Sequence, residues 1–143
     1  MRKSIRLFST TAVLGVAGLA TVFAAPGAGA EVTEVKVAAG PEGLRVGCSY
    51  TVTAVVDAPP SEAGEVTIIN SGGGVPGGGV RLGQATYHPE NGTATFAWTP
   101  EHTGRQNITA QQFTPGQYTS AKYIEVDVTG YGVGTGSSCL PLP

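Results

Sequence analysis

Short segments in which apolar and polar residues alternate, separated by glycine and proline, constrain this chain more than any other feature. The 143 residues include 22 glycines and 10 prolines, and after residue 30 no stretch keeps the i, i+3, i+4 apolar spacing of an amphipathic helix. Alternation is the pattern of a strand with one buried face, because successive side chains of a strand point to opposite sides. The sequence therefore predicts an all-β fold without helices of ordinary length.

Seven strands follow from this alternation. In the strand at 50–56, Tyr50 and the alternate residues after it share one face, which is expected to meet the core. Asn91-Gly92 is a tight-turn signal before the strand at 93–98, since both residues tolerate positive φ. Strands of this length with turns about every ten residues are typical of an antiparallel β-sandwich of the immunoglobulin type. The predicted strands cover residues 32–37, 50–56, 65–69, 82–87, 93–98, 105–113 and 121–129.

The inward faces of these strands predict a single core. Trp98 falls in phase with Ala94 and Phe96, so its side chain is expected to be buried. Glu125 and Asp127 alternate with apolar residues, and their carboxylates are expected on a solvated face. The residues expected to form the core are Val52, Ala54, Val66, Ile68, Phe96, Trp98, Ile108, Ala110 and Val126.

The first thirty residues have the three parts of a secretory signal peptide. A basic start at residues 2–6, an apolar stretch at 7–25 and the small-residue site Ala28-Gly29-Ala30 follow one another. Cleavage would start the mature protein at Glu31 and leave one domain, residues 31–143, of about 113 residues, which is enough for one core. An uncleaved membrane anchor is the alternative, and the polar residues 9–11 disfavour it. We expect a secreted, extracellular protein, free or held non-covalently at the cell wall.

Two cysteines, Cys48 and Cys139, lie in the exported part, where an even number favours one disulfide. The bridge would close a loop of roughly 90 residues and stabilise the domain by about 4 kcal/mol in the chain-entropy model. It would tie the glycine-rich tail, residues 130–143, back near Tyr50, although 140–143 are expected to be loose. A catalytic thiol or a metal pair is the alternative, but neither cysteine has a C-x-x-C partner or a neighbouring histidine.

Net charge limits the possible partners. Without the leader the chain carries five Lys or Arg residues against ten Asp or Glu residues, a formal net charge of −5. The basic residues are scattered, with no two adjacent, whereas binding of a polyanion needs clustered basic side chains. We therefore expect no nucleic acid partner, no attraction to an anionic membrane surface and no membrane insertion after cleavage. The oligomeric state stays open.

Framework residues in the middle of the chain follow a recognisable order: Tyr50–Val56, Gly64–Ile68, Gly92–Pro100, Thr103-Gly104 and Ile108–Ala110. In this order, residues 50–113 resemble the bacterial Ig-like domains, in particular those that occur as repeats in exported actinobacterial and other bacterial surface proteins. The resemblance implies an Ig-like fold and a role as a spacer or adhesion module, sometimes alongside carbohydrate-active enzymes. The chain holds a single copy, and this weakens the interpretation as a pure spacer.

Three features depart from that family. Its late strand usually has an aromatic residue two positions after the alanine, whereas Phe113 lies three after Ala110, which predicts a bulge or a shifted register. The glycine-rich insert at 71–79 is long for its position. The two cysteines do not match the inter-sheet bridge of antibody domains.

Catalytic and metal-binding patterns are missing from the sequence, so we predict a protein that is not an enzyme and has no cofactor or metal. His88 and His102 stand beside turn residues, and there is no G-x-S-x-G, H-x-x-x-H, C-x-x-C or D-x-D motif. The insert at 71–79 lacks the Lys-Ser or Lys-Thr of a phosphate loop and is expected to be a mobile hairpin or inter-sheet loop. An enzyme would need a histidine within hydrogen-bond distance of a serine or a carboxylate.

Exposed aromatic residues are the main functional signal, because sugar rings and apolar ligands stack on them. Tyr123 is one candidate, and the three chosen as binding residues are Tyr87, Tyr118 and Tyr131. The expected function is a non-catalytic binding or structural module of the bacterial cell surface, with an envelope polysaccharide or another surface protein as partner. The alternative is a carrier of a small apolar ligand in the sandwich cleft. A carrier predicts a pocket between residues 71–79 and 112–119, and a surface module predicts a flat or edge-strand aromatic patch.

Overall fold

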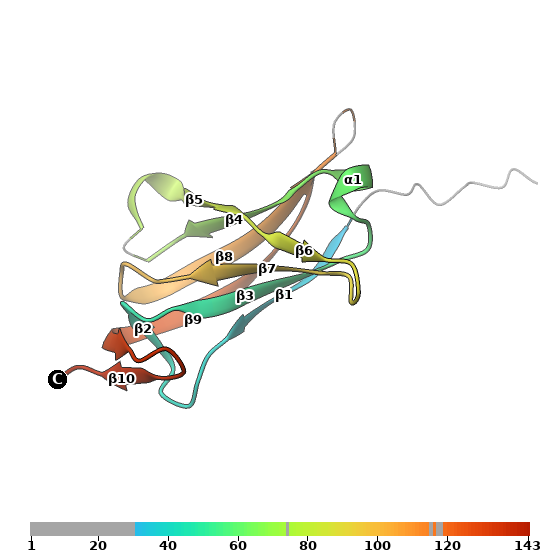
Figure 1. Cartoon of the computed structure of the whole chain (residues 1–143). Coiled ribbons are helices and arrows are strands. Elements are labelled where there is room, and N and C mark those ends of the chain that lie inside the picture. The colour runs from blue at the N-terminus through green and yellow to red at the C-terminus, as the bar shows by residue number, and fades with distance from the viewer. Residues whose placement is uncertain (1–30, 74, 115, 117–118) are drawn as a thin grey trace, which may run out of the picture.

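A computed structural model of the chain describes residues 31–143 except residues 74, 115, 117 and 118. These residues form ten strands, one helical turn and one 3-10 turn (Figure 1). In chain order the elements are β1 (Val32–Ala38), β2 (Leu44–Val46), β3 (Tyr50–Val56), α1 (Pro60–Ala63), β4 (Val66–Ser71), η1 (Pro76–Gly78), β5 (Val80–Gln84), β6 (Thr86–His88), β7 (Thr93–Trp98), β8 (Gly104–Phe113), β9 (Thr119–Gly134) and β10 (Cys139–Pro141).

Two sheets enclose the core. One has four strands in the order β1-β3-β7-β6, and the other has six, with the order β10-β9-β8-β4-β5 and β2 beside β9. The prediction of an all-β chain with two sheets and one disulfide is confirmed. The paired strands of the described chain run antiparallel, as predicted, except that the short β2 runs parallel to β9. There the chain leaves the four-stranded sheet after β1, lies against the other sheet as β2, and returns as β3.

The strand predicted at 82–87 is two strands in different sheets. β5 pairs with β4, whereas β6 pairs with β7, and the chain changes sheet at Ala85, whose N–H donates to the Val66 carbonyl at 2.8 Å. The remaining two unpredicted strands, β2 and β10, have three residues each, which is too short to show alternation. For these reasons the described residues form ten strands where the sequence predicts seven.

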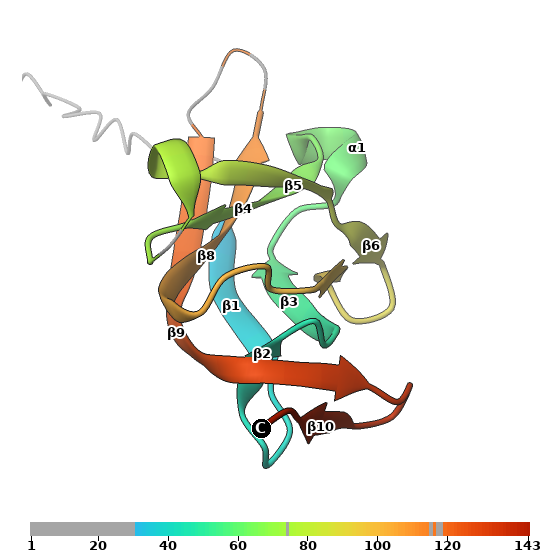
Figure 2. The ribbon, with the colours of Figure 1, turned by 90° about the vertical axis from the view of Figure 1, so that its left-hand side faces the viewer.

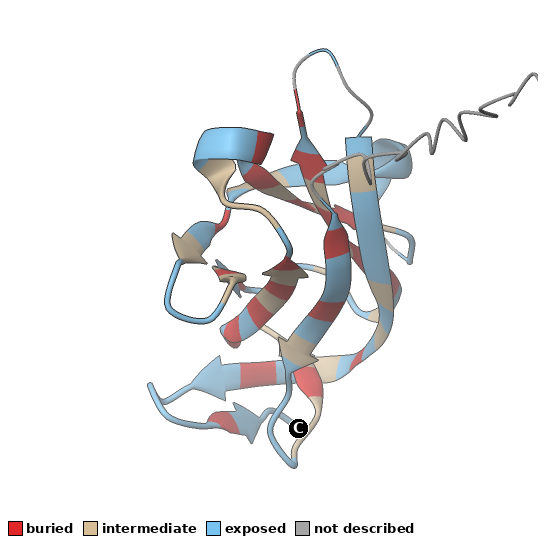
Figure 3. Ribbon diagram, turned by 90° about the vertical axis from the view of Figure 1, so that its right-hand side faces the viewer, coloured by how far each residue is buried: buried red, intermediate tan, exposed pale blue. Residues whose placement is uncertain are grey.

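Seven of the nine predicted core residues are buried, and Phe96 and Val126 are partly buried against the same core (Figure 3). The centre of the four-stranded sheet is set by the β3–β7 register, which pairs Tyr50 with Trp98. Their ring centroids lie 6.4 Å apart, and both side chains are buried. Alternation therefore aligns one face of each strand with a shared apolar interior.

β8 is a regular strand, contrary to the expected bulge near Phe113. Its pairing with β4 and β9 continues without a register shift through Gln112. Gln112 takes the inward position and is fully buried, and its amide donates to the carbonyls of Ala58 at 3.3 Å and Gly64 at 3.0 Å. Phe113 consequently points outward and is 54% exposed.

The C-terminal tail is a hairpin. β9 extends to Gly134, and β10 pairs with it, with Leu140 opposite Val133. Figure 2 shows β9 bending at the lower end of the molecule and turning back as β10. The expectation that residues 140–143 are loose is wrong for 140–142, because the ladder continues to the Leu142 N–H, which donates to the Tyr131 carbonyl at 3.0 Å. No helix within the described ranges is long and apolar enough to cross a membrane.

Candidate functional site

The predicted binding tyrosines do not form one patch. Tyr87, in β6, is partly buried against the core. Tyr131, in the C-terminal hairpin, is 59% exposed, and Tyr118 lies outside the described residues. The two described tyrosines thus belong to different sheets, and only Tyr131 presents its ring to solvent.

A different pair of aromatic rings lies on the outer face of the six-stranded sheet. We define this platform by eight residues of the outer face, which are Glu65, Thr67, Ile69, Arg81, Thr109, Gln111, Phe113 and Tyr123. Phe113 is 54% exposed and Tyr123 is 67% exposed, and both occupy outward positions of neighbouring strands. Cross-strand pairing fixes Tyr123 opposite Thr109, four residues along β8 from Phe113. Four residues span about 14 Å, so the rings bracket a strip of sheet.

Hydrogen-bonding groups lie beside the rings, on β8 and on the β4 and β5 strands that follow it in the sheet. Thr67 pairs with Gln111, and the apolar Ile69 pairs with Thr109, so three of these four side chains are polar. Arg81 on β5 donates from Nη2 to the Thr67 hydroxyl at 3.0 Å. The platform is slightly hollowed, with a depression of about 350 Å³ lined by Glu65, Thr67, Ile69, Arg81, Gln111 and Phe113.

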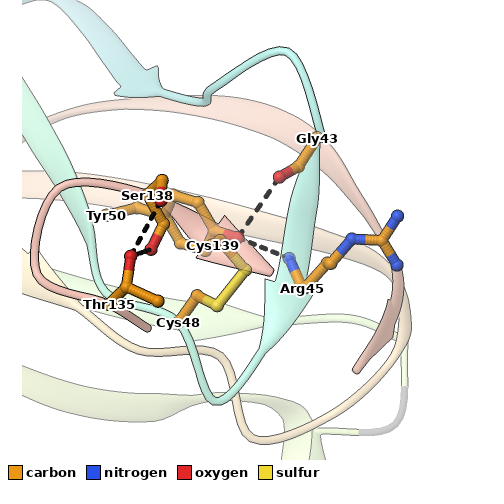
Figure 4. Close-up of a disulfide and its surroundings, with 7 residues drawn as sticks. All are labelled: Gly43, Arg45, Cys48, Tyr50, Thr135, Ser138 and Cys139. Atoms are coloured by element: carbon orange, nitrogen blue, oxygen red, sulfur yellow. Dashed lines mark hydrogen bonds between the residues drawn. A yellow bond between two sulfur atoms is a disulfide. The ribbon is translucent and has the colours of Figure 1, made fainter. Parts of the chain in front are cut away.

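A deeper hollow of about 710 Å³ lies beside the disulfide, between the 38–50 segment and the C-terminal hairpin. Its first wall begins with a β-turn at Gly40-Pro41-Glu42-Gly43, in which the Gly43 N–H donates to the Gly40 carbonyl at 3.0 Å. Proline suits the second position of such a turn, and Gly43 has a φ of 73°, which glycine adopts without strain. The Tyr50 hydroxyl then accepts from the Arg45 N–H at 2.7 Å and donates to the Gly43 carbonyl at 3.2 Å (Figure 4). The wall is therefore fixed to β3.

The second wall of the hollow is the hairpin, which the disulfide attaches to the domain. Cys48 and Cys139 are joined with a Cα–Cα distance of 5.8 Å (Figure 4). Gly132 on β9 leaves room for the bridge, because a Cβ there would lie 2.5 Å from the Cys139 sulfur and 2.9 Å from the Cys48 sulfur. The turn of the hairpin is closed by the Thr135 hydroxyl, 2.8 Å from the Ser138 hydroxyl.

His88 meets the distance condition stated for an enzyme. Its Nε2 lies 2.7 Å from the Thr95 hydroxyl, and its Nδ1 lies 3.5 Å from a carboxylate oxygen of Glu90. This order resembles a hydrolytic triad with threonine as nucleophile. Thr95, however, is paired with β3 on one side and with β6 on the other. The backbone N–H groups around it therefore belong to the sheet ladders and do not converge on a reacting oxygen. Neither hollow is lined by these residues.

Within the described parts of 71–79 and 112–119, between which a carrier pocket is expected, neither hollow is lined by residues of both segments. The β4–β8 register pairs Ser71 with Asn107 and Val66 with Gln112, so the two segments lie at opposite ends of this strand pair. The 71–79 segment instead connects β4 to β5 as a hairpin loop containing η1. Among the described residues, no group of three or more His, Cys, Asp or Glu side chains is placed to hold a metal ion.

Comparisons with protein-family models, curated proteins and solved structures found no match to this chain. Sequence reasoning missed Phe113 as a surface residue, although strict alternation from Ile108 and Ala110 would have placed Gln112 inward and Phe113 outward.

Proposed function

We propose that this chain is a secreted, non-catalytic binding module that holds a neutral polysaccharide of the bacterial cell envelope on the platform of its six-stranded sheet. The observation that carries the proposal is the exposure of Phe113 and Tyr123 on one flat face. Aromatic rings of this size normally bury most of their area, and an exposed pair favours a partner that covers them.

Sugars suit the platform because they combine apolar ring faces with many hydroxyl groups. The faces stack on Phe113 and Tyr123, while Gln111, Thr109 and Arg81 offer amide, hydroxyl and guanidinium groups on the strands beside the rings. The depression is open and shallow, so an extended chain fits it better than an enclosed small molecule. A neutral polymer is favoured because the net charge of −5, from five basic and ten acidic residues after Ala30, repels an anionic one.

Secretion and the Ig-like assignment belong to this proposal. Residues 1–30 support export by their signal-peptide pattern, and a disulfide is typical of proteins that fold in an oxidising compartment. The Ig-like assignment draws support from the two-sheet architecture and from the resemblance of residues 50–113. N-terminal sequencing of protein recovered from culture medium tests the export: we expect the chain to begin at Glu31, and recovery of an intact leader would contradict it.

Binding is tested by co-sedimentation of oxidised residues 31–143, which contain every described element, with isolated envelope fractions and insoluble neutral polysaccharides. We expect saturable pelleting that is lost in the double variant Phe113→Ala/Tyr123→Ala. Tyr131→Ala is the matched control, because Tyr131 is also more than half exposed but lies off the platform. Equal loss in the control, or full binding by the double variant, would contradict the platform as the site.

A further inference from the structure

The hollow beside the disulfide contains a carboxylate that nothing else in the described chain engages. Glu42 lies at the third position of the Gly40–Gly43 turn and lines the hollow. Its Oε2 lies 2.7 Å from the point where a Cβ of residue 40 would stand, so the glycine at that position makes room for the carboxylate. None of the salt bridges between described residues includes Glu42.

The lining has negative charge and no basic side chain. Within the part of the chain described, Glu42 is the only Asp, Glu, Lys, Arg or His residue that lines the hollow. A carboxylate in a concave, partly water-excluding surface attracts a cation more strongly than one on open surface, because nearby low-dielectric walls concentrate its field. A ligand for this hollow is therefore expected to carry positive charge.

Hydroxyl groups and bare backbone make up most of the remaining surface. Ser49, Thr99 and Ser137 line the hollow, and their hydroxyls make no side-chain hydrogen bond to any other described residue. Five glycines of the lining are at least partly exposed and leave backbone groups accessible, and they are Gly40, Gly43, Gly47, Gly134 and Gly136. Such a surface offers donors and acceptors beside a similar share of apolar area, which matches a ligand with hydroxyl groups around apolar ring faces.

We propose that this hollow binds an amino sugar whose ammonium group pairs with the Glu42 carboxylate while its hydroxyls bond to Ser49, Thr99 and Ser137. At about 710 Å³ the hollow has room for a short oligosaccharide. The site shares no residue with the platform, so a substitution in one region can abolish its binding activity and leave the other activity unchanged. The disulfide belongs to the site because it holds the hairpin wall, including Ser137, against the domain.

Calorimetric titration of the oxidised chain with a chitosan tetrasaccharide, which carries ammonium groups, tests the proposal against its N-acetylated counterpart. We expect binding of the first and at least tenfold weaker binding of the second, since acetylation removes the positive charge that pairs with the Glu42 carboxylate. Putrescine, a diamine without hydroxyls, should also bind at least tenfold more weakly. Equal binding of the acetylated sugar or of putrescine would overturn the assignment.

Three variants locate the site. Glu42→Gln should weaken binding at least tenfold, and Gly40→Ala should weaken it because the new methyl displaces the carboxylate. Glu62→Gln is the matched control, since Glu62 is an exposed carboxylate on α1 away from the hollow. Melting curves confirm that the variants are folded. Retention of affinity in Glu42→Gln, or equal loss in Glu62→Gln, would contradict the proposal. The Phe113→Ala/Tyr123→Ala variant should bind chitosan normally, which separates this site from the platform.

Discussion

The platform and the hollow are built in opposite ways. The platform uses neighbouring strands whose register is set by regular pairing, and its side chains follow from strand alternation alone. The hollow joins segments far apart in the sequence, residues 38–50 and 132–139, and needs one covalent bond to hold them together. A surface of the first kind depends on the stability of the whole sheet, whereas the second depends on one hairpin. The two regions should therefore respond differently to the same change.

Removal of the disulfide is expected to have the largest effect. Cys48→Ser/Cys139→Ser should lower the free energy of unfolding by about 4 kcal/mol, because the bridge closes a loop with a sequence separation of 91 residues. Denaturant titration without reductant measures the loss, and the wild-type chain in reductant provides the control. Below its melting temperature the variant should still pellet with polysaccharide but lose chitosan binding. Loss of both activities in the folded variant would contradict the independence of the two regions.

A smaller effect is expected at a glycine under the bridge. Gly132→Ala should destabilise the chain by about 1–3 kcal/mol, since the methyl group would overlap both disulfide sulfurs and the Leu140 carbonyl. Gly134→Ala, two residues along the same strand, is the control, because a Cβ there meets nothing within 4 Å. Thermal denaturation of the two variants compares them directly. Similar melting temperatures would show that the hairpin is not packed tightly against the disulfide.

Changes on the platform should scarcely affect stability. Phe113→Ala and Tyr123→Ala remove rings that are more than half exposed, so each should change the free energy of unfolding by no more than about 0.5 kcal/mol. Denaturant titration of each single variant checks this value. A decrease of several kcal/mol in the free energy of unfolding would mean that the rings stabilise the fold. The loss of polysaccharide binding would then be explained by unfolding, without any contact between the rings and a ligand.

No effect at all is expected in a hydrolysis assay. The wild-type chain and His88→Ala should hydrolyse p-nitrophenyl acetate at the same background rate, because the N–H groups around Thr95 serve the sheet. Rate measurements at equal protein concentration make the comparison. A wild-type rate clearly above that of His88→Ala would establish a catalytic site in the four-stranded sheet, outside both regions.

Alternation was enough to predict most of the sandwich. It placed β3 and β7 and the inward direction of Val52, Ala54 and Trp98, because an apolar face repeated every second residue has one plausible partner, the core. It failed for the change of sheet at Ala85, since an extended segment looks the same in either sheet. It also failed for the short strands β2 and β10, whose pairing depends on the disulfide and on neighbouring turns.

The candidate sites were harder to predict because they depend on which face a residue takes. Tyr87 and Tyr123 are equally aromatic, yet the fold partly buries one and leaves the other 67% exposed. Gln112 is polar but buried, because its amide satisfies backbone carbonyls next to α1. The pairing of Cys48 with Cys139 was predictable from their number, whereas the hollow beside them required the path of the whole chain.

The central claim is that the platform binds the polysaccharide, and NMR chemical-shift mapping tests it most directly. The oxidised chain is titrated with a soluble fragment of the polysaccharide with which it co-sediments. We predict that the amide signals of Thr109, Gln111, Phe113 and Tyr123 shift on addition, while those of residues 38–50 and 132–139 stay unchanged. Shifts confined to the second set, or spread evenly over both, would contradict the account.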